Sequence, residues 1–237
     1  MIIAKVRKQK KLQNNLYKMS IAQNLLKIKS TLSSTVTLVA VSKTKPTPDL
    51  MEAYDAGQRI FGENKIQEMA EKWEAMPKDI EWHMIGHVQT NKVKYMAPFV
   101  SLIHGVDSLK LLEEINKQAQ KNNRIIDCLL QMYIAEEETK FGLDEEELND
   151  ILTSAAFQEM KNIRIVGLMG MATFTDNQTQ IKKEFTQLKS IFDKLRLSKD
   201  AINRVSTLSM GMSGDYQLAI ECGSTMIRIG SSIFGGR

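Results

Sequence analysis

Segments typical of strands and of helices alternate along the chain from about residue 36 to the end. The strand-like runs are Thr37 to Val41, Arg59 to Phe61, Glu81 to Ile85, Val100 to Gly105, Ile125 to Ile134, Ile163 to Gly170, Arg204 to Ser209 and Met226 to Ile229. Helix-like patterns lie between them, for example at Ser108 to Asn122, Asp144 to Phe157 and Asp176 to Leu195. Such alternation predicts a parallel sheet, and about eight units predict closure into a (β/α)₈ barrel. No Gly-x-Gly-x-x-Gly follows the first strand, which disfavours a dinucleotide-binding sheet.

No linker rich in Pro, Gly or Ser divides the barrel segment, so we expect one domain over residues 36–237. Residues 1–35 are predicted to form a basic extension followed by a helix, with Ser20 as its cap and Leu25, Leu26 and Ile28 at helical spacing. We expect the native domain to start near Met19, with residues 1–18 as an upstream extension without a fold of its own.

Charge and cysteine content exclude several classes of protein. The net charge is +4, and residues 1–29 contain eight basic and no acidic residues. The remainder is slightly acidic, which argues against a nucleic-acid-binding groove. Two cysteines cannot build a disulfide framework, and no apolar run has the length of a membrane helix. The basic N-terminus lacks both the apolar core of a signal peptide and the Arg and Ser richness of a transit peptide, so we expect a cytoplasmic protein.

A lysine follows the first strand closely. In Val36 to Pro48, alternation places Thr37, Val39, Val41 and Lys43 on one face, so Lys43 is the polar tip of a buried row. Two interpretations are open: an ordinary surface lysine on a loop, or an amine in a half-apolar setting that forms a Schiff base.

In a barrel, the residues that follow each strand meet on one rim, which carries the active site. The last two strands are followed by small and hydroxyl-bearing residues, Ser209 to Gly214 and Gly230 to Ser232. Such loops bring backbone N–H groups close to an anion, and barrels commonly bind phosphate there. The pattern predicts a phosphate site, although each loop alone is also compatible with a simple turn.

Arg228 lies inside the last strand, where a charged side chain requires a partner. It could pair with a neighbouring acid or donate to a ligand. A lysine amine, a phosphate site and an interior arginine together fit pyridoxal 5′-phosphate. Lys43 would bind its aldehyde as a Schiff base, and Arg228 would face its ring nitrogen and leave it a weak electron sink.

Five ordered motifs carry a resemblance to a known family. They are Val39 to Pro46, Phe61 to Asn64, Trp82 to Gly86, Leu208 to Ser213 and Gly223 to Gly230. The chain resembles the pyridoxal phosphate homeostasis protein family, also called the YggS or PROSC family, from about Val36 to Arg237. That family is similar in fold to the N-terminal barrel of alanine racemase.

The resemblance implies a set of cofactor-binding residues. Lys43, and not Lys45, would carry the cofactor, with Asn64 beside it and Arg228 on the ring nitrogen. The remaining residues would lie on the phosphate or the ring face: Ser209, Gly211, Met212, Ser213, Gly230 and Ser231.

Three functions remain open from the sequence. The first, which we favour, is a protein that holds pyridoxal phosphate without dedicated turnover and passes it to apo enzymes or amino acids; we expect it to be a monomer. A racemase-like enzyme is the main alternative; it would need a second base, typically from a further domain that we do not expect here. An aldolase that uses Lys43 on a sugar phosphate is the third. His83 and His87 are four residues apart, but they lie on strand and loop without a third ligand, so no metal site is expected.

Overall fold

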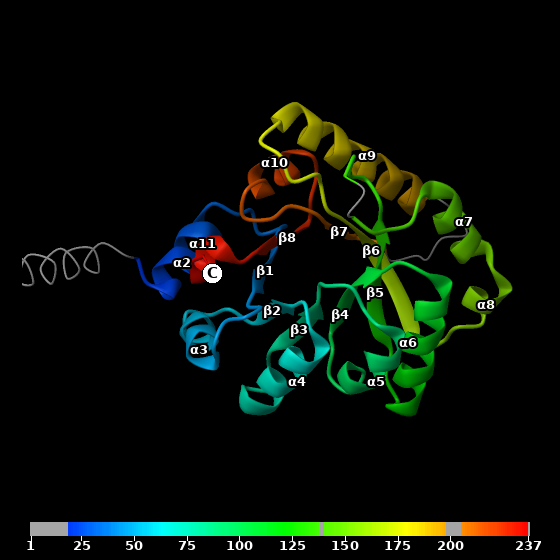
Figure 1. Cartoon of the computed structure of the whole chain (residues 1–237), viewed down its shortest axis with the longest axis horizontal. Coiled ribbons are helices and arrows are strands. Elements are labelled where there is room, and N and C mark those ends of the chain that lie inside the picture. The colour runs from blue at the N-terminus through cyan, green and yellow to red at the C-terminus, as the bar shows by residue number, and fades with distance from the viewer. Residues whose placement is uncertain (1–18, 138–139, 198–204, 237) are drawn as a thin grey trace, which may run out of the picture.

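The computed structural model of the protein describes residues 19–137, 140–197 and 205–236. Eight parallel strands form a closed barrel in sequence order, with β1 hydrogen-bonded to both β2 and β8. Helices surround this ring of strands, as Figure 1 shows in a view into the barrel. The predicted (β/α)₈ fold with an additional N-terminal helix is confirmed.

The strands are β1 Thr37–Val41, β2 Ile60–Glu63, β3 Glu81–Met84, β4 Leu102–Val106, β5 Ile126–Met132, β6 Ile163–Gly170, β7 Thr207–Ser209 and β8 Met226–Ile229. The helices are α2 Ile21–Ser30, α3 Thr47–Asp55, α4 Ile66–Ala75, α5 Val93–Met96, α6 Leu109–Lys121, α7 Glu145–Thr153, α8 Ala155–Gln158, α9 Gln178–Leu197, α10 Tyr216–Glu221 and α11 Ser231–Phe234. A 3₁₀ turn, η1 Thr90–Lys92, precedes α5.

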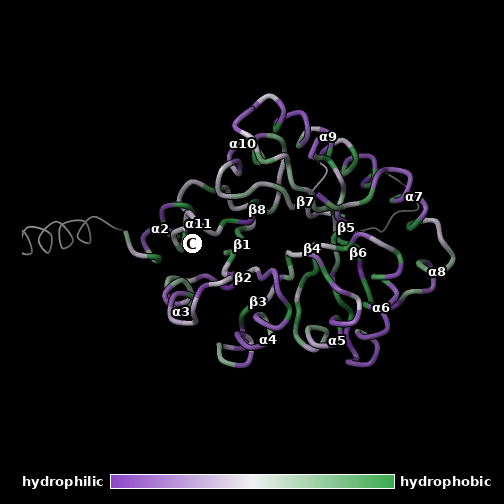
Figure 2. The backbone as a smooth tube through the Cα atoms, viewed as in Figure 1, coloured by the Kyte–Doolittle hydropathy of each residue, from purple (hydrophilic) through white to green (hydrophobic). Residues whose placement is uncertain are grey.

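The alternation of side chains in β1 produces two separate cores. Leu38 and Ala40 point outward into the large core between strands and helices. Val39 points inward and packs in the barrel interior against Leu102, Leu129, Met169 and Met226. Apolar strands and polar outer helix faces are both visible in Figure 2. The inward row continues from Val39 through Val41 to Lys43, as the alternation predicts.

The N-terminal helix is held to the end of the barrel. The Ser20 hydroxyl accepts from the backbone N–H of Gln23 while the Gln23 side chain accepts from that of Ser20, which forms a capping box. Leu25 is fully buried, and the Asn24 side chain donates to the carbonyl of Ile233 in α11, 3.0 Å away. The expected cap is confirmed, whereas residues 1–18 lie outside the described residues.

Two details of the predicted elements were wrong. The pattern from Asp144 to Phe157 forms two helices, because Ser154 is extended (φ −66°, ψ 140°) and its hydroxyl caps α8. Gly62 and Glu63 belong to β2 instead of following it. The backbone of Glu63 pairs with Met84 of β3, and Ser42 and Lys72 bind its carboxylate.

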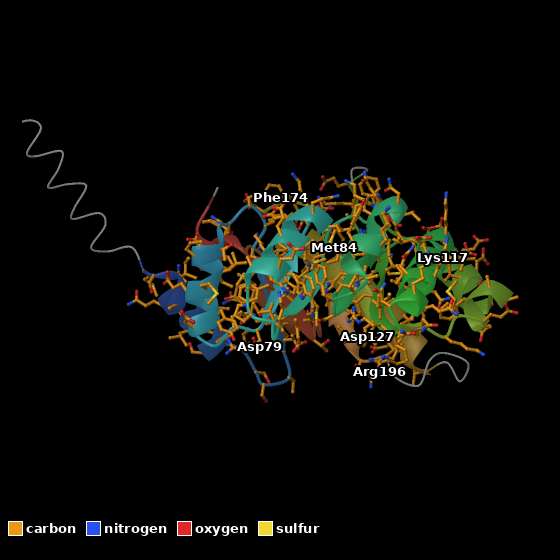
Figure 3. All side chains as sticks on the ribbon, turned by 90° about the horizontal axis from the view of Figure 1, so that it is seen from below. Asp79, Met84, Lys117, Asp127, Phe174 and Arg196 are labelled. Carbon is orange, nitrogen blue, oxygen red and sulfur yellow. The ribbon has the colours of Figure 1, made fainter. Side chains whose placement is uncertain are left out.

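The two ends of the barrel differ in what they expose. Figure 3 shows Phe174, which follows β6, at one end, and Asp79 and Asp127, which lie near the starts of β3 and β5, at the other. The first end is therefore the rim on which the strands' carboxyl ends meet. Among the described residues, no helix combines the length and the apolar content that a membrane span needs.

Candidate cofactor site at the carboxyl ends of the strands

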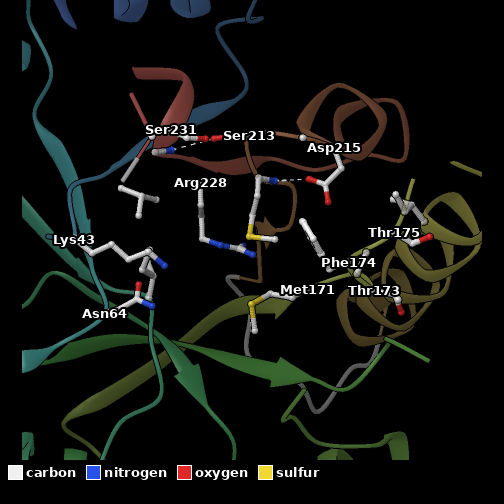
Figure 4. Close-up of a pocket in the computed structure, with 18 of the residues that line it drawn as sticks. Lys43, Asn64, Met171, Thr173, Phe174, Thr175, Ser213, Asp215, Arg228 and Ser231 are labelled. Atoms are coloured by element: carbon white, nitrogen blue, oxygen red, sulfur yellow. Dashed lines mark hydrogen bonds between the residues drawn. The ribbon is translucent and has the colours of Figure 1, made fainter. Parts of the chain in front are cut away.

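A cavity of about 490 Å³ opens at the carboxyl end of the barrel. Seven of the nine residues expected at the cofactor line it: Lys43, Asn64, Met212, Ser213, Arg228, Gly230 and Ser231. In Figure 4, Lys43 and Asn64 lie on one side of the cavity and Thr173, Phe174 and Thr175 on the other. Arg228 lies between the two sides.

Lys43 is held by a constrained loop. It is partly buried and lines the cavity with Val41. The next residue, Thr44, has φ +63°, a conformation unusual for a residue with a side chain. Its N–H donates to Glu68 Oε1 at 2.6 Å, which offsets the strain. The loop therefore fixes the direction in which Lys43 leaves the strand.

A buried ion cluster lies beneath the same loop. The amine of Lys72 on α4 donates to the carbonyl of Ser42 at 2.8 Å and to one carboxylate oxygen each of Glu63 and Glu68 at 2.7 Å. Burial raises the pKa of Glu63, and the hydrogen bonds from Lys72 and Ser42 oppose that rise. The cluster ties β1, β2 and α4 together directly behind Lys43.

Arg228 is a buried cation at the bottom of the cavity. Its side chain donates from Nη1 to Ser209 Oγ at 2.7 Å and from Nη2 to the carbonyl of Gly170 at 3.1 Å. Burial lowers the pKa of Arg228 to about 10, and the charge of Asp215 opposes that fall. The guanidinium thus stays protonated at neutral pH and keeps donors available at the cavity.

A chain of hydrogen bonds continues from Arg228 across the barrel interior. His104 Nδ1 lies 3.1 Å from Ser209 Oγ, and its Nε2 lies 3.1 Å from His83 Nδ1. Burial lowers the pKa of both rings, that of His83 to about 3, so both are neutral. These hydrogen bonds connect Arg228 through Ser209 and His104 to His83. Two histidines that the sequence did not connect to the site thus orient its arginine.

Ser209 and Gly211 do not line the cavity. Ser209 lies behind Arg228, as described above. Gly211 has φ +97°, and a Cβ there would lie 2.6 Å from that of Ala219. Its carbonyl accepts from the backbone N–H of Arg228 at 3.0 Å. Glycine is required at this position for the turn that brings Met212 and Ser213 to the cavity.

The loop after β6 forms a further wall of the cavity, and its residues were not among the expected cofactor-binding residues. The buried carboxylate of Glu184 on α9 accepts from the N–H and the hydroxyl of Thr173, both at 2.7 Å, and from the N–H of Glu136. It thereby joins the loops after β5 and β6. The position of Met171 to Thr173 at the end of a strand could have indicated that they line the cavity. No feature of the sequence indicated this for Phe174 or Asp215.

Lys45 also lines the cavity, and its amine is engaged elsewhere. It donates to the carbonyls of Phe234, Gly235 and Gly236 at 3.2, 3.1 and 3.0 Å. These bonds fasten the C-terminal segment, which follows Gly230 and Ser231, to the loop that carries Lys43. The two lysines of the motif thus have different environments.

Comparison with known proteins shows which family the chain belongs to. The family model "Alanine racemase, N-terminal domain" matches residues 18–237. A relative from Aquifex aeolicus, named pyridoxal phosphate homeostasis protein, is 39% identical over 201 residues, 84% of this chain and 86% of its own. The chain belongs to the pyridoxal phosphate homeostasis protein family.

The fold is similar to those of solved family members and of alanine racemases. PipY of Synechococcus elongatus PCC7942, solved with PLP bound, is 34% identical, with a TM-score of 0.83 over 91% of this chain and 100% of PipY. Alanine racemase from E. faecalis is 16% identical, with a TM-score of 0.74, and the match spans 58% of that chain. The second likeness shows the fold alone. The resemblance to the pyridoxal phosphate homeostasis protein family is therefore confirmed.

Proposed function

We propose that the protein binds pyridoxal 5′-phosphate and takes part in its homeostasis, with Lys43 as the amine that holds the cofactor as a Schiff base. One observation carries the proposal: the fold gathers the Lys43 amine, the Arg228 guanidinium and the Ser213 and Ser231 hydroxyls around one cavity. PipY, which is 34% identical, was solved with PLP bound, which supports the choice of cofactor.

The residues of the cavity fit the cofactor in two respects. Nothing lies within 4 Å of the place that a Cβ would take at Gly214, so the backbone there is accessible to a phosphate, and a Cβ at Gly230 would lie 3.1 Å from the carbonyl oxygen of Val41, so glycine suits the tight packing there. The Gly230 N–H lies 3.3 Å from Ser213 Oγ, which brings the two predicted phosphate segments together. Asn64 completes the side of the cavity next to Lys43.

Bound pyridoxal phosphate supplies an aldehyde that condenses with a primary amine, and a ring that withdraws electrons most strongly when its nitrogen is protonated. Arg228 favours binding of the cofactor over catalytic turnover. It remains a cation at neutral pH and would donate to the ring nitrogen without transferring its proton. Lys43 would anchor the cofactor, and the segments around Ser213 and Ser231 would bind its phosphate.

We further propose a carrier without dedicated catalytic turnover, active as a cytoplasmic monomer that passes the cofactor to apo enzymes or small amines. The names of the curated relatives support a homeostasis role over a racemase. Neither cysteine forms a disulfide, and Cys128 is buried, which suits a reducing compartment.

Absorption spectroscopy tests the proposal. The protein, incubated with pyridoxal phosphate and then desalted, should retain the absorbance of a lysine-bound cofactor. Lys43→Ala should lose it, and Lys94→Ala, at an exposed position away from the cavity, should keep it. Absence of this absorbance from the wild type would favour the aldolase alternative. In D₂O the loaded protein should exchange the α-proton of alanine no faster than free cofactor does; faster exchange would favour the racemase alternative.

A further inference from the structure

The side of the cavity that faces Lys43 is apolar and carries two carboxylates. These residues affect which compounds can approach the cofactor. We call this side the distal wall and define it by Met171, Phe174, Asp176, Ile181 and Asp215, all of which line the cavity. None of these residues belongs to the expected cofactor set. The inference below rests on the proposed function, because it concerns molecules that would react with the cofactor on Lys43.

Several donors in the loop after β6 and at the start of α9 bind oxygen atoms of the protein. The N–H and hydroxyl of Thr173 donate to the buried carboxylate of Glu184, and the N–H of Phe174 donates to Glu137 Oε2 at 3.3 Å. At the start of α9, the N–H of Gln180 donates to Asn177 Oδ1. These N–H and O–H groups already donate hydrogen bonds to oxygen atoms of the protein, so they do not form a site for a ligand's carboxylate.

The basic residues around the cavity have other roles, at the cofactor or within the protein. Among the described residues only Lys43, Lys45 and Arg228 line it as cations, and all three lie outside the distal wall. Lys45 binds three carbonyls, and Arg228 binds Ser209 and Gly170. Lys43 would hold the cofactor. The distal wall instead carries two carboxylates, those of Asp176 and Asp215.

The remaining surface of the distal wall is apolar. Phe174 is 91% exposed although it lies at the cavity, so its ring is available to a ligand. Met171 extends this apolar surface, and the largely buried Ile181 lies beneath it. An ammonium group with an apolar body would therefore be favoured beside these residues, whereas a carboxylate would meet the like charges of Asp176 and Asp215.

We propose that the distal wall is a subsite for primary amines that have an apolar body and no carboxylate, and that these amines, more than α-amino acids, exchange with Lys43 for the cofactor. In the exchange, the guest nitrogen forms the bond to the cofactor carbon that the Lys43 nitrogen gives up. Two protons pass from the guest nitrogen to that of Lys43, and nothing is oxidised or reduced.

A matched pair of amines tests the proposal. 2-Phenylethylamine and L-phenylalanine differ only in the carboxylate. Each is titrated into the loaded protein while the lysine-bound absorbance is followed, and each result is divided by that for free pyridoxal phosphate, which removes the intrinsic reactivity of the amine. We expect phenylethylamine to displace Lys43 about 10-fold more effectively after this correction. An equal or greater effect of phenylalanine would overturn the proposal.

Two variants assign the selectivity to the distal wall. Asp215→Asn keeps an acceptor for the N–H of Met212 but removes a charge, so it should lower the preference for phenylethylamine about 3-fold. Phe174→Ala should weaken both amines, and Tyr95→Ala, at an exposed aromatic residue outside the cavity, should weaken neither. Unchanged behaviour of both wall variants would overturn the assignment. Failure of the proposed function is recognised separately, since the lysine-bound absorbance would then be missing before any amine is added.

Discussion

At the scale of single residues, Arg228 depends on groups that the ligand would never touch. Its guanidinium is buried and ordered by Ser209 and Gly170, and Ser209 is in turn oriented by His104. Ser213, by contrast, lies at the cavity itself and contacts the backbone of Gly230. The two serines come from one motif, yet the structure gives them different neighbours, and their contributions to cofactor binding should differ accordingly.

We expect Ser209→Ala to weaken pyridoxal phosphate binding about 10-fold, because a hydrogen bond to a charged group is lost behind the ring-nitrogen site. Competition by inorganic phosphate should be unchanged in this variant and weakened in Ser213→Ala. Absorbance titrations with both ligands measure these effects. The matched control is Ser206→Ala, an exposed serine on the same segment. Loss of phosphate competition in Ser209→Ala would show that Ser209 acts on the phosphate and not through Arg228.

At the scale of elements, the backbone of the loop after β1 is held in place by side chains of α4. Lys72 on α4 binds its backbone at Ser42, and Glu68 on the same helix binds it at Thr44. Glu63 on β2 is fully buried, and its side chain depends on Lys72 for a counter-charge. Removing this lysine would leave a carboxylate inside the protein without its partner.

Lys72→Met should therefore lower the free energy of unfolding by about 3 kcal/mol, since breaking a buried ion pair leaves an uncompensated charge. Urea denaturation followed by circular dichroism measures the change. Lys117→Met removes an exposed lysine whose ion pair with Glu114 lies on one helix face, and it should cost less than about 0.5 kcal/mol. Equal effects of the two substitutions would refute a structural role for the buried cluster.

At the scale of the whole molecule, the two buried histidines link stability to pH. Burial lowers the pKa of both, that of His83 to about 3, whereas histidine in an unfolded chain titrates near 6.5. Below about pH 6.5 the unfolded chain thus binds protons that the folded protein does not. The stabilising contribution of the neutral rings is complete above that pH and is lost as the pH falls toward 3.

Urea denaturation at pH 7, 6 and 5 should show unfolding free energy falling with pH by about 1 kcal/mol per unit for each buried histidine. His104→Gln should reduce this slope, because one of the two rings is then absent. His87→Gln, at an exposed position on the rim, should leave it unchanged. A slope that is the same in all three proteins would contradict the account of the histidine pair.

Much of this molecule is predictable from its sequence because the strongest signals are local. The alternation in β1 sets the inward row from Val39 to Lys43, and Ser20 marks the start of α2. What was missed depends on distant contacts. Glu184 organises the loop after β6 from the first turns of α9, and Lys72 reaches Ser42 from α4. No periodicity or motif in the sequence predicts these hydrogen bonds, because the closed barrel brings together residues that are far apart in the sequence.

The same distinction holds within the predicted site. Met171 and Met212 line the cavity, but Met169 packs inside the barrel and Met210 packs in the outer core, although all four lie at one rim in the sequence. Strand alternation places neighbouring residues on opposite faces. A sequence motif therefore predicts which region of the fold forms the site, whereas the backbone conformation determines which of its side chains face the cavity.

Borohydride reduction followed by peptide mapping tests the central claim most directly. The protein is incubated with pyridoxal phosphate, reduced, digested and analysed by mass spectrometry. We expect one dominant phosphopyridoxyl adduct on Lys43, with Lys45 unmodified because its amine is bound to the three carbonyls of the C-terminal segment. A dominant adduct on Lys45 or another lysine, or none with excess cofactor, would contradict the assignment of Lys43 as the residue that holds the cofactor.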